Sequence, residues 1–113
     1  MTLRLAPRLL DAVRRHAEEA YPRECCGFLI GFDHGGEREI VSVTPADNAE
    51  TGSPAGRYLV APEHYFKAEC DAARRGLAVK GFYHSHPGAE AVPSEADRAG
   101  ALPGVSYLIV SVI

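Results

Sequence analysis

The apolar run Cys25–Phe32 constrains the fold of this chain more than any other stretch of the sequence. It contains no charged or amide side chain, and Gly27 and Gly31 interrupt it twice. A strand with one solvent-exposed face alternates apolar and polar residues, whereas a strand buried on both faces is continuously apolar. Glycine inside such a strand marks a position that another backbone or a ligand approaches closely. We therefore expect Cys25–Phe32 to be a strand that is buried on both faces of a sheet.

Two long helices are predicted to cover that sheet. The first spans Pro7–Ala20, where proline suits the first turn and apolar residues recur at helical spacing until Tyr21-Pro22 ends the pattern. The second spans Pro62–Arg75 and is capped by Gly76. The apolar face predicted for this second helix consists of Tyr65, Phe66, Cys70 and Ala73.

Four further strands and one short helix complete the prediction. They are strands over Glu37–Thr44, Arg57–Val60, Leu77–Tyr83 and Val105–Ile113, and a helix over Ser94–Ala101. This order of elements favours an α+β fold in α/β/α layers, with a central mixed β-sheet flanked by helices. A chain of 113 residues is expected to form a single domain, residues 1–113.

Composition and charge exclude several classes of protein. The net charge is −3 and no long run of lysine or arginine occurs, so we expect no nucleic-acid partner. No stretch approaches the ~20 apolar residues of a membrane span, and the N-terminus lacks a hydrophobic signal core, so we expect a cytoplasmic protein without membrane contact. The three cysteines form no Cys-x-x-Cys pair, which excludes zinc-finger and cytidine-deaminase patterns and indicates reduced thiols.

Potential metal ligands follow the strand predicted over Leu77–Tyr83. His84 and His86 are two residues apart and point the same way on an extended chain, because side chains alternate along a strand. Asp97 follows near the start of the predicted short helix and can supply a carboxylate. Three protein ligands leave the fourth position of Zn²⁺ to water, which separates catalytic from structural zinc. Two neutral imidazoles and one carboxylate leave a charge of about +1, which lowers the pKa of such a water toward ~7.

Two further residues are candidates for the chemistry. Glu24, at the entry to the buried strand, could be the general base, and Ser94 could donate to the oxyanion. Ser94-x-x-Asp97 also matches a helix capping box, and this interpretation is compatible with the first. A structural zinc site would need Cys70 or His64 as a fourth ligand, and nothing in the spacing favours either.

The combined pattern resembles the JAMM (MPN-plus) metalloprotease family. The residues that carry the resemblance are Glu24 upstream, then His84-x-His86, seven residues, and Ser94-x-x-Asp97. Context outside this motif is also similar, over Pro22–Gly31, Arg57-Tyr58 and Val79–Tyr83, so the resemblance covers most of the chain. It implies a cytidine-deaminase-like JAMM/MPN fold, Zn²⁺ on His84, His86 and Asp97, Glu24 as base, and Ser94 at the oxyanion.

The resemblance also implies a substrate. Small prokaryotic-type members act on amide or isopeptide bonds after the C-terminal Gly-Gly of ubiquitin-like proteins, including sulfur-carrier proteins. We therefore expect a zinc-dependent metallopeptidase or isopeptidase of that class. The alternative is a non-catalytic MPN-type protein-interaction module, which would predict a damaged motif. The chain ends inside its last predicted strand, where relatives usually carry further elements. We expect this apolar edge to pair, either in a homodimer or in aggregation, and a C-terminal truncation is an alternative explanation.

Overall fold

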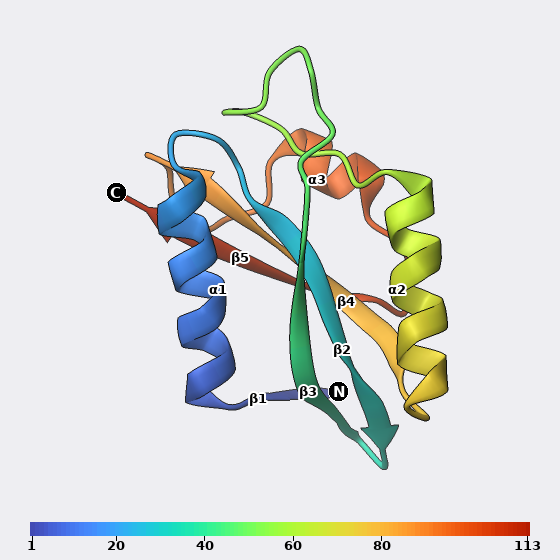
Figure 1. Ribbon diagram of the computed structural model, residues 1–113. Coiled ribbons are helices and arrows are strands. Elements are labelled where there is room, and N and C mark those ends of the chain that lie inside the picture. Colours follow the sequence, from blue (N-terminus) through green and yellow to red (C-terminus); the bar gives the residue numbers. More distant parts are fainter.

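A mixed five-stranded sheet forms the centre of the molecule in the computed structural model, which describes residues 1–113 (Figure 1). The strand order is β1-β3-β2-β4-β5. Strand β2 pairs with β3 and β4 in antiparallel orientation, while β1–β3 and β4–β5 are parallel pairs. The elements are β1 (Thr2–Leu5), α1 (Pro7–Ala20), β2 (Cys26–His34), β3 (Glu37–Ala46), α2 (Pro62–Arg74), β4 (Ala78–Pro87), α3 (Glu95–Gly100) and β5 (Ser106–Val112).

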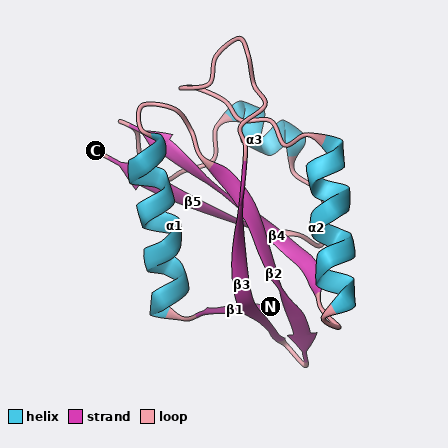
Figure 2. Cartoon of the chain, viewed as in Figure 1, coloured by secondary structure: helices cyan, strands magenta, loops and turns pink.

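Helices α1 and α2 lie on opposite faces of this sheet (Figures 1 and 2). On one face, Leu9, Val13 and Ala17 of α1 pack against residues of β2, β3 and β4. On the other face, Ala68 and Ala72 of α2 pack against aromatic and aliphatic residues of β2 and β4. The predicted α+β fold with a central mixed sheet is therefore confirmed. No helix in the structure has the length and apolar content that crossing a membrane requires.

Strand β2 occupies the middle of the sheet, as the run Cys25–Phe32 predicts. Its first six residues are buried. The two glycines stand where close approach was expected: a Cβ on Gly27 would collide with the ring of Tyr83, and one on Gly31 with the carbonyl of Glu39. Only glycine at these two positions allows the neighbouring strands to pack this closely.

One predicted strand is absent, and one observed strand was not predicted. Arg57–Val60 forms no strand, because its backbone pairs with the side chain of Asn48 and with Ala49 rather than with the sheet. Thr2–Leu5, which the prediction missed, instead adds a parallel edge strand beside β3. Strand β4 also continues past Tyr83 to Pro87, so that both histidines of the motif lie within it.

The predicted apolar face of α2 is also wrong in part. Phe66 is 68% exposed and Ala73 is exposed, whereas the buried residues are Ala68 and Ala72. Tyr65, Ala68 and Ala72 share one face at helical spacing. Small alanine side chains let the helix lie close to the sheet, so size rather than hydrophobicity selects this face.

Candidate metal centre

Strand β4 presents His84 and His86 on the face of the sheet that α2 covers. The two histidines lie two and four residues beyond Phe82, which packs against α2, so strand alternation directs all three side chains to that face. The two Nε2 atoms are 3.2 Å apart. His84 is almost completely buried, with 1% of its surface exposed, and His86 is buried as well.

Helix α3 brings Asp97 to these histidines. Asp97 Oδ2 lies 3.1 Å from His84 Nε2 and 3.0 Å from His86 Nε2. The same oxygen accepts the backbone N–H of Ser94 at 2.9 Å, and Ser94 Oγ accepts the N–H of Asp97 at 3.0 Å. The capping box allowed by the sequence therefore exists, and it holds the carboxylate that faces the two imidazoles.

The hydrogen bonding of His86 is compatible with a metal ion at this place. His86 Nδ1 lies 2.8 Å from the carbonyl oxygen of Glu90, and because a carbonyl only accepts, Nδ1 carries the proton. With the proton on Nδ1, the other ring nitrogen, Nε2, faces the carboxylate of Asp97. Two acceptors at 3.0 Å repel each other unless a proton or a metal ion lies between them. A backbone carbonyl on the far nitrogen is also the usual partner of a metal-binding histidine.

The spacing of the three donor atoms fits a small tetrahedral ion. Two ligands that each bind zinc at their normal distance in tetrahedral geometry lie about 3.3 Å apart. The three separations here are 3.0, 3.1 and 3.2 Å. Burial lowers the pKa of His84, although the charge of Asp97 raises it, and the net result favours the neutral imidazole that a metal requires. For Asp97, burial raises the pKa, but the Ser94 backbone N–H and His84 outweigh it and favour the carboxylate.

Glu24 lies beside this group in a buried position. It immediately precedes the Cys25 backbone, which is tied to Ser85 of β4 by two hydrogen bonds, Cys25 N–H to Ser85 Oγ at 2.8 Å and Ser85 N–H to the Cys25 carbonyl at 3.1 Å. The ligand atoms of Glu24, His84 and His86 lie within 4.8 Å of one another. Glu24 Oε1 is buried without a hydrogen-bond partner, and burial raises the pKa of this carboxyl to about 7. The group is therefore compatible with a metal ion, and Glu24 is the uncommitted carboxyl next to it.

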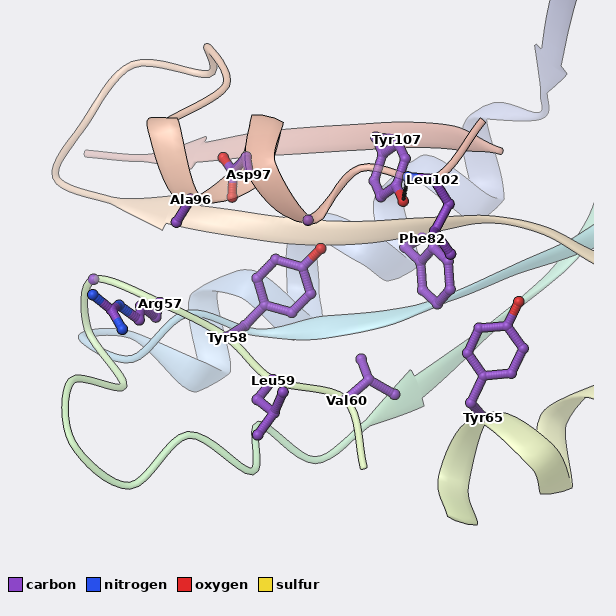
Figure 3. A pocket seen from close by; sticks show the side chains of 12 residues that line it. Arg57, Tyr58, Leu59, Val60, Tyr65, Phe82, Ala96, Asp97, Leu102 and Tyr107 are labelled. Carbon is purple, nitrogen blue, oxygen red and sulfur yellow. Dashed lines mark hydrogen bonds between the residues drawn. The ribbon is translucent and has the colours of Figure 1, made fainter. Parts of the chain in front are cut away.

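A groove leads along the sheet to Asp97. It has a volume of about 320 Å³, and the segment Arg57–Val60 forms one side while α3 forms the other (Figure 3). Phe82 and Tyr107 contribute apolar surface from the sheet. Tyr58 lies over one of the candidate metal ligands, since its ring stacks on the imidazole of His84 with centroids 4.5 Å apart.

The structure brings the candidate site residues close together and adds two contacts that the sequence did not predict. The structure places Glu24, His84, His86 and Asp97 in one cluster, with Ser94 exposed at the cap of α3. The sequence did not predict that Tyr58 stacks on His84 or that the Glu90 carbonyl lies against His86. The tyrosine stood in the segment that resembles the JAMM family, but no pattern in the sequence reports a backbone carbonyl.

Comparison with known proteins identifies the family. Residues 6–112 match the family described as prokaryotic homologs of the JAB domain. The chain belongs to this family. It is similar to a desampylase from Haloferax volcanii, with 35% identity over 114 residues that cover 96% of this chain and 80% of the relative. It is also similar to a probable TtuB-protein conjugate cleaving protease from Thermus thermophilus, with 36% identity over 89% of this chain and 64% of that protein, slightly less than two thirds of its length.

A solved structure supports the same assignment. The solution structure of protein DSY2949 from Desulfitobacterium hafniense superposes with a TM-score of 0.85 at 34% sequence identity. The match covers 98% of this chain and 75% of the other. The recognised resemblance to the JAMM family, of the small prokaryotic type, is thus confirmed for the fold and for the sequence.

Proposed function

We propose that this JAB-domain protein is a zinc-dependent metallopeptidase that hydrolyses the amide bond after the C-terminal Gly-Gly of a ubiquitin-like protein. The observation that carries the proposal is the set of three donor atoms, His84 Nε2, His86 Nε2 and Asp97 Oδ2, beside the buried and unpartnered carboxyl of Glu24. Catalytic zinc sites combine three protein ligands with a nearby general base. A non-catalytic module would need no such carboxyl, and burying it without a partner costs free energy.

In this proposal His84, His86 and Asp97 hold the zinc ion. When bound, zinc supplies Lewis acidity, which polarises the scissile carbonyl and makes an attacking water more acidic. The chain keeps these ligands ready for it. The Glu90 carbonyl fixes the tautomer of His86, and the capping box fixes Asp97. Such outer contacts orient metal ligands before the ion arrives.

Glu24 serves as the general base and then as the general acid. Its carboxyl takes a proton from the attacking water and later delivers that proton to the leaving amine. A base is most effective when its pKa is close to the working pH, and burial raises the pKa of Glu24 to about 7. Ser94 is proposed for the other role: its Oγ accepts from the N–H of Asp97, so its own O–H is free to donate to the oxyanion.

The substrate assignment rests on the groove and on the relatives. An extended C-terminal tail could occupy the groove between Arg57–Val60 and α3, where Tyr58 lies next to the metal ligands. Glycine residues let the backbone approach a site that side chains would block. The names of the relatives, a desampylase and a conjugate-cleaving protease, support protein conjugates as the substrate class.

A matched pair of conjugates tests this function. One carries an amide-linked fluorophore after Gly-Gly of a ubiquitin-like protein, and the other carries it after Gly-Val. Protein stripped with chelator and then restored with zinc is expected to release the fluorophore from the first conjugate much faster than from the second. Binding of the Gly-Gly conjugate without cleavage, in protein that contains zinc, would favour the interaction module and overturn the proposal.

A further inference from the structure

The side chain of Asn48 connects three segments that meet at the candidate site. Its Nδ2 donates to the carbonyl of Arg57 at 3.0 Å and to that of Glu24 at 3.1 Å, with a longer contact of 3.4 Å to Pro54. Its Oδ1 accepts the N–H of Glu50 at 3.0 Å and that of Leu59 at 3.1 Å. Every amide atom therefore has partners, and a rotated amide would place its oxygen against three carbonyls.

These side-chain contacts take the place of strand pairing in the loop that contains Asn48. Residues 47–61 belong to no strand or helix. Apart from a local turn at Ser53, where the carbonyl accepts from Gly56 and Arg57, one backbone bond joins the two arms of this loop, from Ala49 N–H to the Leu59 carbonyl at 2.8 Å. A second bond runs from Glu24 N–H to the Pro54 carbonyl at 2.7 Å. A loop of this length without regular structure depends on such side-chain anchors for a fixed path.

The anchors lie on both sides of Tyr58. Asn48 accepts from the N–H of Leu59 and donates to the carbonyl of Arg57, which are the two neighbours of Tyr58. The ring of Tyr58 stacks on His84 with an interplanar angle of 24°. The position of this ring over a metal ligand is thus set by the amide of Asn48.

The same amide holds the backbone of Glu24. The Glu24 carbonyl accepts from Asn48 Nδ2, and the Glu24 N–H donates to Pro54 within the loop that Asn48 organises. The main chain of the base is therefore fixed on both sides by this loop. A displacement of about 1 Å at a catalytic group can cost about 100-fold in rate.

We propose that Asn48 is a positioning residue that sets Glu24 and Tyr58 together, so that the general base and the wall of the groove are ordered by one side chain. This proposal rests on the function proposed above for the rate measurements, and on the geometry alone for the measurements on metal-free protein. Asn48 belongs neither to the candidate metal ligands nor to the lining of the groove. Its effect passes through the backbone of Glu24 and of the residues beside Tyr58.

The test compares Asn48→Asp and Asn48→Ala with Glu50→Gln. Asp keeps the acceptor for Leu59 and Glu50 but loses both donors, while Ala loses all five contacts. Glu50 is the control because its Oε1 holds only the tip of the same loop, at Gly52 and Ser53, and does not contact Glu24. In zinc-restored protein we expect kcat to fall by about 10- to 100-fold in both Asn48 variants, with zinc content unchanged. Glu50→Gln should stay within about twofold of the wild type.

The readout in metal-free protein does not depend on any substrate. Stacking of Tyr58 shifts the ring protons of His84 upfield in NMR spectra. We expect this shift to disappear in the Asn48 variants and in Tyr58→Leu, and to persist in Glu50→Gln. A purely structural role would lower the melting temperature without moving this signal or the kcat of folded molecules. Persistence of the shift and of kcat in folded Asn48→Asp would overturn the proposal.

Hydrogen exchange of the wild type decides the proposal even if both variants fail to fold. The Leu59 amide, which donates to Asn48 Oδ1, should exchange much more slowly than the Gly52 amide at the loop tip. Equal exchange of the two amides would show that Asn48 does not order the loop and would overturn the proposal. Because this measurement uses no conjugate, inactivity of the wild type toward ubiquitin-like substrates would refute the proposed function while leaving this test intact.

Discussion

The ring of Tyr58 lies against the imidazole of His84, with centroids 4.5 Å apart and planes inclined by 24°. This contact joins a loop residue to a residue of the central sheet and places an aromatic surface directly beside the candidate metal ligands. Tyr58 and Asp97 both line the groove in Figure 3, so one end of the groove lies at the candidate metal ligands. A molecule in the groove would contact both Tyr58 and Asp97.

Replacing Tyr58 should weaken substrate binding without removing the metal. An aromatic contact contributes about 0.5–1.5 kcal/mol beyond its buried area, which corresponds to a rise in KM of about 2- to 10-fold for Tyr58→Leu. Tyr58→Phe keeps the ring and should behave like the wild type. Steady-state kinetics together with zinc analysis check this expectation, and loss of zinc from Tyr58→Leu would argue against a role confined to the groove.

Glu24→Gln should retain zinc and lose turnover. Glutamine has nearly the shape of glutamate but cannot take a proton from water, and general base catalysis typically contributes about 10²- to 10⁴-fold. Zinc content and the rate of conjugate cleavage are measured on the same sample. Glu63→Gln, on the exposed first turn of α2, is the matched control and should leave both unchanged. Turnover retained in Glu24→Gln would exclude Glu24 as the base.

Ser94→Ala should have two separable effects. Loss of the donor to the oxyanion is expected to lower kcat by about 10²- to 10³-fold. Loss of the N-cap of α3 should reduce the free energy of unfolding by about 1 kcal/mol. Ser94→Thr retains the hydroxyl and should restore both properties, as measured by kinetics and by denaturant unfolding. A variant that loses stability but keeps kcat would reduce Ser94 to its capping role.

The metal-free protein should become less stable as the pH rises, because of Glu24. The pKa of this carboxyl is raised from 4.5 to about 7 by burial, so the folded protein keeps a proton that the unfolded chain releases. The free energy of unfolding due to Glu24 therefore falls between about pH 4.5 and pH 7 and is constant above that range.

Denaturant unfolding in chelator at pH 5 and pH 8 measures this effect. Other groups titrate in the same range, so the comparison is between the wild type and Glu24→Gln. The wild type should lose more stability between the two pH values than the variant does. Equal changes in the two proteins would mean that Glu24 is not held in a desolvated position.

The placement of the candidate ligands could be predicted from the sequence because much of the information for it is local. His84 and His86 share a strand, and Ser94 and Asp97 share one helical turn, so strand alternation and the capping pattern are enough to direct their side chains. The continuous apolar character of Cys25–Phe32 likewise predicted the central strand. What these patterns cannot report is which distant segment lies over the site.

The errors lie where long-range packing outweighs local pattern. Arg57–Val60 has strand-like residues, but the amide of Asn48 takes its hydrogen bonds, so it forms a loop. Thr2–Leu5 is short and mostly exposed, and its pairing with β3 could not be read from its residues. In α2 the prediction placed Phe66 on the buried face because it is more hydrophobic than Ala68. The structure buries Ala68 instead, because close packing of the helix against the sheet requires the smaller side chain.

The measurement that tests the central claim most directly is the zinc content of the purified protein, determined by elemental analysis of the wild type and of His84→Ala. His64→Ala, a histidine of α2 outside the cluster, is the control. We predict about one zinc ion per chain in the wild type and in His64→Ala, and none in folded His84→Ala. A folded wild type that binds no zinc when it is supplied, or a His84→Ala variant that retains it, would contradict the assignment of the metal centre.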